Sequence, residues 1–170
     1  MALIVETGEG SNPAANTYAT VAQLRSFAAA RGATLPAADA DCEVLLLRAM
    51  DYVEAQESRY QGERMRFDQP LSWPRTGVIL YGRGLASNVI PAPLLNAQMA
   101  LAIQAQTADL MPAQLPGERG AVTRYAVGSL EMEYADPVSQ TTTPRFPAVE
   151  AFLAPLMAGA GYGTIRLVRA

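Results

Sequence analysis

The segment between residues 59 and 90 most constrains the fold, because it interrupts a chain whose other long stretches mostly follow helical spacing. Prolines and glycines recur in it too closely for a long helix: Pro70, Pro74, Gly77, Gly82 and Gly84. Proline removes a backbone donor and glycine favours turns, so neither residue readily continues a helix. We therefore predict a long structured loop over residues 59–90, placed between helices.

This segment also reverses the charge of the chain. Residues 59–83 carry five arginines and two acidic residues, whereas the whole chain of 170 residues has a net charge of −3. The sole tryptophan, Trp73, lies here together with Tyr60, Phe67 and Tyr81. Arginine and aromatic residues are typical of single-strand binding sites, and they are also enriched at protein interfaces. The segment is therefore a candidate binding surface of either kind.

Helices are predicted on both sides of this loop. Thr20 and Gln23 have the spacing of a capping box, which predicts a first helix over residues 21–31. A second helix is expected to begin near Asp39 or Asp41, with one of the two as its cap, and to continue to about residue 56.

Two further helices follow the loop. Pro91 and Pro93 suit the first turn of a third helix, which should continue to about Leu110. Pro147 suits the start of a short fourth helix that Pro155 should kink or end.

Extended segments are predicted in three places. Residues 2–5 favour a short strand, and the alternation over residues 121–135 predicts a β-hairpin joined at residues 128–129. Residues 160–170 are expected to form either an arm that orders on a partner or a last strand of the same domain.

The predicted fold class is mainly α, a small bundle of about four helices with a long structured loop and an inserted β-hairpin. We expect a single domain, with a helical core over residues 17–110 and 147–158. No run of residues is apolar enough for a membrane span, so no membrane partner is expected.

The composition argues against most enzyme chemistry. The chain has no histidine, and all 13 of its basic residues are arginine, so the commonest general base and any Schiff-base lysine are missing. Asp39, Asp41 and Glu43 have the spacing that opens a calcium loop, but neither the turn glycine nor the distal glutamate follows. We expect no enzyme activity, no catalytic residues, no cofactor and no metal.

Several segments in this order carry a resemblance to a known family. They are ALIVETGEGSNPAANTYATVAQLRSFAAARG, LLRAMDYVEA, RYQGER, DQPLSWPRTGV, IPAPLLNAQMALA and VGSLEMEYA. Together they resemble a tailed-bacteriophage family often described as DnaT-like single-stranded-DNA-binding proteins, and the resemblance covers nearly the whole chain. Such proteins also resemble phage head-to-tail adaptor (connector) proteins. The Trp-Pro-Arg block at residues 73–75 is the most specific piece.

The adaptor resemblance implies a structural virion protein, located in the neck at the head-tail junction and made in the host cytoplasm. It would form a cyclic ring of about twelve subunits between the portal protein and a downstream tail or stopper protein. Double-stranded DNA would pass through the acidic lumen without sequence-specific contact. The candidates for the subunit interface are Arg59, Tyr60, Arg64, Arg66, Trp73 and Arg75, and those for a portal-binding arm are Tyr162, Ile165, Arg166, Leu167, Val168 and Arg169.

The alternative is a DnaT-like replication accessory protein that binds single-stranded DNA. Tyr60, Phe67, Trp73 and Tyr81, interleaved with arginines, fit that function. The sequence pI of about 5.0 and the absence of lysine argue against it, because a dedicated DNA binder is usually basic. On this balance the sequence favours the adaptor.

Overall fold

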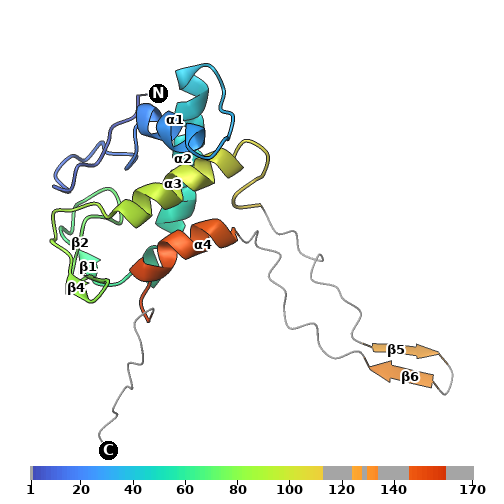
Figure 1. The fold of residues 1–170 in the computed structure, drawn as a ribbon. Helices are drawn as coiled ribbons and strands as arrows, with labels where there is room; N and C mark the ends of the chain where they lie inside the picture. The colour runs from blue at the N-terminus through green and yellow to red at the C-terminus, as the bar shows by residue number, and fades with distance from the viewer. Residues whose placement is uncertain (1, 113–123, 128–129, 134–145, 160–170) are drawn as a thin grey trace, which may run out of the picture. The chain divides into compact units, whose positions relative to one another are not determined.

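The computed structural model describes residues 2–112, 124–127, 130–133 and 146–159 (Figure 1). The chain forms two compact units, Met1–Leu110 with Phe146–Ala170, and Met111–Arg145. The portal-binding arm candidates between residues 162 and 169 lie outside the described residues.

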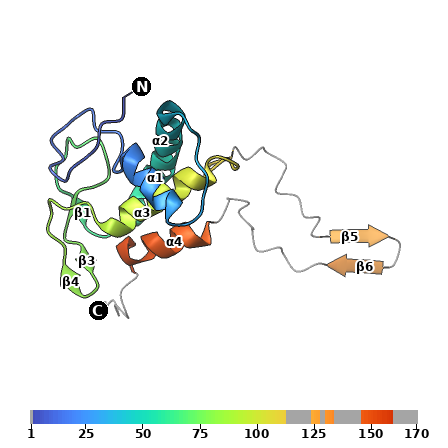
Figure 2. The same cartoon turned by 45° about the horizontal axis from the view of Figure 1, so that its top comes forward.

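The described residues of the first unit include four α-helices. They are α1 (Val21–Ala29), α2 (Asp39–Ala55), α3 (Ala92–Gln104) and α4 (Pro147–Leu153), and a 3-10 turn η2 (Ala154–Leu156) follows α4. Helix α3 packs against each of the other three α-helices, as Figures 1 and 2 show. The predicted fold class, mainly α with a small β insertion, is confirmed. Within the described residues, none of the helices has the length and apolar character needed to cross a membrane.

The local signals at the helix ends are partly as predicted. The capping box is present: the Thr20 hydroxyl accepts from the Gln23 N–H at 3.1 Å, and the Gln23 side chain accepts from the Thr20 N–H at 2.8 Å. The predicted cap of α2 is wrong. Ala38 occupies the N-cap position without a side-chain bond, and Asp39 pairs instead with Arg25 at 2.7 Å. Both Asp39 and Asp41 lie in the first turn, where the helix dipole favours acidic residues.

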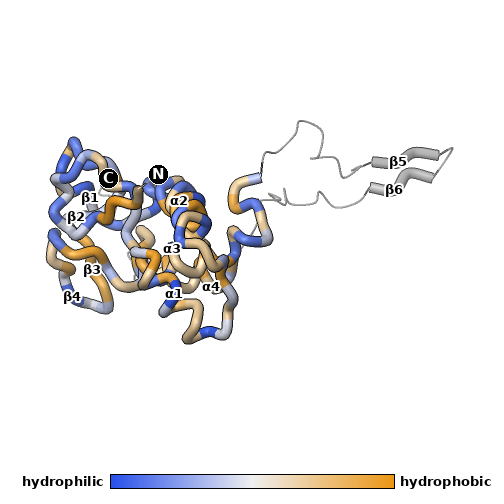
Figure 3. Tube along the Cα trace, turned by 90° about the horizontal axis from the view of Figure 1, so that it is seen from above, coloured by the Kyte–Doolittle hydropathy of each residue, from blue (hydrophilic) through white to orange (hydrophobic). Residues whose placement is uncertain are grey.

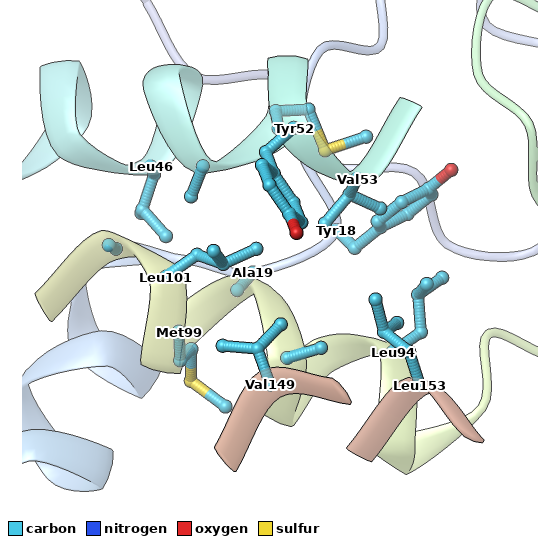
Figure 4. Close-up of a cluster of buried hydrophobic side chains, with 14 of the residues drawn as sticks. Tyr18, Ala19, Leu46, Tyr52, Val53, Leu94, Met99, Leu101, Val149 and Leu153 are labelled. Carbon is cyan, nitrogen blue, oxygen red and sulfur yellow. The ribbon is translucent and has the colours of Figure 1, made fainter. Parts of the chain in front are cut away.

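The core lies between α2, α3 and α4. Figure 4 shows Leu46 and Val53 of α2 facing α3, with Val149 and Leu153 of α4 on the other side. All four side chains are buried. Burying apolar area at about 25 cal/mol per Å² is the main force that holds these helices together.

One buried polar side chain fastens the N-terminal segment to this core. Gln98 of α3 has no exposed surface, and its amide nitrogen donates to the Thr17 hydroxyl at 2.8 Å and to the Leu46 carbonyl at 3.2 Å. Its amide oxygen accepts from the N–H groups of Tyr18 and Ala19, both at 3.1 Å. Every polar atom of this side chain is therefore satisfied, as burial requires. The strand predicted over residues 2–5 is reduced to one bridge between Val5 and Thr17.

The predicted long loop contains short regular elements. The 3-10 turn η1 (Glu57–Arg59) is followed by two antiparallel pairs, β1 (Glu63–Arg64) with β2 (Arg75–Thr76), and β3 (Ile79–Leu80) with β4 (Arg83–Gly84). Figures 1, 2 and 3 agree in placing both pairs at the same end of the helical unit. We call residues 65–74 the β1–β2 loop, and Tyr81 with Gly82 the β3–β4 turn.

The second unit contains the predicted hairpin. Strand β5 (Arg124–Val127) pairs antiparallel with β6 (Leu130–Glu133), in a register that places Val127 opposite Leu130 and Arg124 opposite Glu133. These strands cover residues 124–127 and 130–133 of the predicted span 121–135, and the other residues of that span lie outside the described structure.

Candidate functional site

The inner side of the arginine-rich segment is built around Trp73. Its side chain has no exposed surface, and the Tyr60 ring packs edge-to-face against it with the ring centroids 5.7 Å apart. The Tyr60 hydroxyl donates to the Val53 carbonyl at 2.9 Å, and burial raises the Tyr60 pKa above its ordinary value. Both aromatic rings are therefore part of the chain's own core, and neither presents a face to an external ligand.

Arg75 serves as an internal crosslink. Its side chain is 7% exposed, and its guanidinium donates to the carbonyls of Gln61 and Gly62, each at 2.7 Å, and of Ser72 at 3.2 Å. Burial lowers the Arg75 pKa below its ordinary value, although the Glu57 carboxylate acts in the opposite direction. Because the guanidinium is used to bind backbone oxygens, Arg75 closes the base of the β1–β2 loop.

Arg64 has an equally local partner. Its Nε and Nη2 atoms donate to the two carboxylate oxygens of Glu57, the second bond measuring 2.6 Å, and its Nη1 donates to the Gln69 carbonyl at 2.8 Å. The bond from Arg64 lowers the Glu57 pKa, and the nearby charges of Arg64 and Arg75 lower it further. Two of the five arginines of this segment are thus engaged inside the chain.

A half-buried carboxylate attaches the loop to α2. Glu54 accepts from the Tyr18 hydroxyl at 2.9 Å, from the Ser72 N–H at 2.7 Å and from the Ser72 hydroxyl at 2.8 Å. The Tyr18 oxygen in turn accepts from the Trp73 N–H at 3.0 Å. Burial raises the Glu54 pKa above its ordinary value, while the hydrogen bonds lower it. This network fixes the backbone that carries Trp73.

The Glu57 carboxylate gives the first testable prediction. Replacing Glu57 by glutamine should lower the free energy of unfolding at neutral pH by about 1 kcal/mol or less, because the ion pair is about one-third exposed. The Glu57 pKa is lower in the folded chain than in the unfolded chain. The carboxylate therefore adds to the free energy of unfolding above its unfolded-state pKa, and this stabilisation is lost as the pH falls through its folded-state pKa. The difference between the two proteins in urea unfolding should therefore vanish at acidic pH. A difference that does not change with pH would contradict this.

The outer side of the segment presents a different set of residues. The Phe67 side chain in the β1–β2 loop is fully exposed, at 102% of its reference area, and Tyr81 in the β3–β4 turn is 79% exposed. Arg59, Arg66 and Arg83 are also exposed. Arg66 pairs with Asp68 at 3.2 Å, and Arg59 donates to Gln56 at 2.7 Å. We call Phe67, Tyr81, Arg59, Arg66 and Arg83 the outer aromatic-arginine surface.

The β3–β4 turn holds its aromatic ring on an unusual backbone. Tyr81 has φ +52° and Gly82 has φ +78°, and two positive values in a two-residue hairpin loop define a type I′ turn. Asparagine, aspartate and glycine are favoured at the first of these positions, whereas a positive φ at a bulky residue costs conformational free energy. A tyrosine at this position, with most of its ring in solvent, is a candidate for a functional residue.

The structure thus divides the residues that the sequence grouped together. Of the six predicted interface residues, Tyr60, Trp73 and Arg75 are buried, Arg64 is half-buried and bonded to Glu57, and Arg59 and Arg66 are exposed. Of the four aromatic residues considered for base stacking, only Phe67 and Tyr81 are accessible. Ile79, 59% exposed beside the β3–β4 turn, was not among the candidates.

Comparison with known proteins gives one family. The family model described as "Putative DnaT-like ssDNA binding protein" matches residues 1–170. Neither the search of curated proteins nor the search of solved structures found a match.

These findings correct the adaptor interpretation. The family that matches is described by single-stranded DNA binding, so it supports the alternative and contradicts the predicted head-to-tail adaptor, its ring, and its portal and tail partners. The net acidity of the chain is a poor guide to this segment, because a net charge does not describe the local surface. The predicted location in the virion neck stays a prediction.

Proposed function

Because the chain belongs to the DnaT-like single-stranded-DNA-binding protein family, we propose that it binds single-stranded DNA through the outer aromatic-arginine surface. The observation that carries the proposal is the exposure of Phe67 and Tyr81, from the two strand pairs at the same end of the helical unit, on a segment whose other aromatic rings are buried. Proteins that bind single strands stack bases on exposed aromatic side chains and guide the backbone with positive charge.

The aromatic rings and the arginines have different roles in the proposed binding, because their side chains differ in chemistry. A ring that stacks on a base contributes about 1–3 kcal/mol, and because every base has a π-face, stacking tolerates any sequence. The arginines contact phosphates, which positions the strand without reading its sequence. The ion pair between Arg66 and Asp68 has both partners well exposed, so exchanging Asp68 for a phosphate costs little.

Because the chain is acidic, we expect electrostatic attraction to contribute little to its affinity for DNA. Arg64 and Arg75 are engaged by Glu57 and by backbone carbonyls, which leaves three exposed arginines on this surface. Counterion release on single strands contributes a slope of about −0.7 per neutralised phosphate in a plot of log affinity against log salt. We therefore expect binding that depends more on the rings than on charge.

The proposal is tested by measuring binding of a fluorescent oligo(dT) and of a matched duplex by anisotropy over a series of salt concentrations. The single strand should bind more tightly, because the faces of paired bases are covered by their neighbours, and the salt slope should be about −2 or shallower. A slope of about −5 would show that an extended basic groove dominates. Equal affinity for the duplex would overturn the proposal.

A further inference from the structure

The β3–β4 pair has one face on the core and one face open. Val78 is 1% exposed, and Leu80 and Leu85 pack against the core cluster. The Leu85 N–H donates to the Val78 carbonyl at 2.8 Å, which continues the pairing. Because side chains alternate between the two faces of a strand, Ile79 points away from the core, and it is 59% exposed. Figure 3 shows that the chain around β3 is strongly hydrophobic, in contrast to β1.

The register places a glycine beside this exposed isoleucine. Ile79 is the partner of Gly84, so both lie on the same open face of the pair. A Cβ atom added at Gly84 would meet no heavy atom within 4 Å, and Gly84 is outside the positive-φ region that favours glycine. Neither packing nor backbone conformation within the described residues therefore requires glycine at this position.

At Gly62 and Gly82 of the same segment, in contrast, the structure does require glycine. A Cβ at Gly62 would lie 1.9 Å from the Thr76 carbonyl oxygen, and Gly62 also has φ +66°. Gly82 has φ +78°, which the type I′ turn needs. Gly84 has neither property, although glycine in a strand costs about 0.5–1 kcal/mol relative to alanine. A strand glycine of this kind often marks the close approach of a ligand.

We propose that Gly84 and Ile79 form a seat for one unpaired nucleobase, beside the β3–β4 turn that carries Tyr81. This inference rests on the proposed function, and it assigns a base contact that the aromatic rings alone do not supply. The base lies flat over the Gly84 backbone and against the Ile79 side chain.

The chemistry of the seat defines the class of ligand. Glycine and isoleucine have no side-chain donor or acceptor, so the seat accepts any base through its flat face and does not distinguish their edges. A paired and stacked base cannot present that face, so the seat takes single strands. The occupant is therefore an unpaired nucleobase of any identity.

A larger side chain at position 84 tests the proposal, because it would occupy the space of the base. Replacing Gly84 by valine should lower the affinity for oligo(dT) by about tenfold, the lower part of the range for one stacked base, and replacing it by alanine should have a smaller effect in the same direction. Because the site is open, neither change should lower the thermal unfolding temperature, and alanine should raise it slightly. Replacing Val44 by alanine, which removes an exposed apolar side chain from α2, is the matched control and should bind normally.

Photocrosslinking to a bromodeoxyuridine oligonucleotide separates the seat from the rest of the surface. Trypsin releases residues 76–83, which contain Ile79 and Tyr81, apart from residues 67–75, which contain Phe67. Crosslinks on residues 76–83 that weaken in the Gly84→Val protein support the seat. If the unmodified protein binds DNA but the Gly84 variants bind equally well, the seat is wrong and the proposed function stands. If the unmodified protein does not bind DNA, both fail.

Discussion

Replacing Trp73 by alanine should lower the free energy of unfolding by about 3–5 kcal/mol, because the change leaves a cavity at the centre of the arginine-rich segment. The Trp73 side chain has no exposed surface and packs against the Tyr60 ring. Typical domains have a free energy of unfolding of only about 5–15 kcal/mol, so this single change should remove a large part of the stability. Urea unfolding followed by circular dichroism measures the effect without using the lost tryptophan.

Phe67→Ala is the control for this experiment, because it removes an aromatic ring six residues away that is fully exposed. It should change the free energy of unfolding by no more than about 0.5 kcal/mol, as surface substitutions usually do. If Trp73→Ala proves as mild as Phe67→Ala, the buried position of Trp73 is wrong. Binding of single-stranded DNA would then have to be reconsidered with Trp73 as a stacking residue.

The helices were predictable because their signals are local. The capping box at Thr20 and the prolines that open α3 and α4 act within one helical turn, so their effect on the backbone can be derived from neighbouring residues alone. The prediction was less accurate at the start of α2. There, Asp39 forms a longer-range pair with Arg25 instead of capping its own helix.

The division of the arginines could not be predicted from the sequence. Arg64 and Arg66 are two residues apart, yet one is bound to Glu57 and the other is exposed. Which arginine is buried depends on where η1 places the Glu57 carboxylate and where the chain turns at Gln61. These positions are set by the folded backbone, and no spacing rule along the chain encodes them.

The sequence favours the adaptor function wrongly for the same reason, because it does not show which charged side chains are used inside the fold. The low sequence pI favours the adaptor only as a property of the whole chain, and it does not describe the charge of this segment's surface. In the folded chain, Glu54 and Glu57 are used internally to hold Ser72, Tyr18 and Arg64. Much of the nearby acidity therefore acts on the protein's own loop. Base stacking, moreover, does not depend on the net charge of the protein.

Removing both exposed rings should have the largest effect on DNA binding. A protein with Phe67→Ala and Tyr81→Asn should lose about 2–6 kcal/mol of binding free energy for oligo(dT), which is at least about a 30-fold loss of affinity. Asparagine is favoured at the first position of a type I′ turn, so Tyr81→Asn removes the ring and relieves the strain of its positive φ at the same time. Stability should therefore stay equal or rise while affinity falls.

Opposite changes in stability and affinity are the decisive feature of this experiment, because a misfolded variant would lose both. The emission of the buried Trp73 should not change in the double variant, which shows that the core is intact. The matched protein with Phe67→Tyr and Tyr81→Phe keeps both rings and should bind within about twofold of the original, since a stacking platform needs the ring and not the hydroxyl. Undiminished binding by the ring-deleted protein would place the DNA elsewhere on the chain.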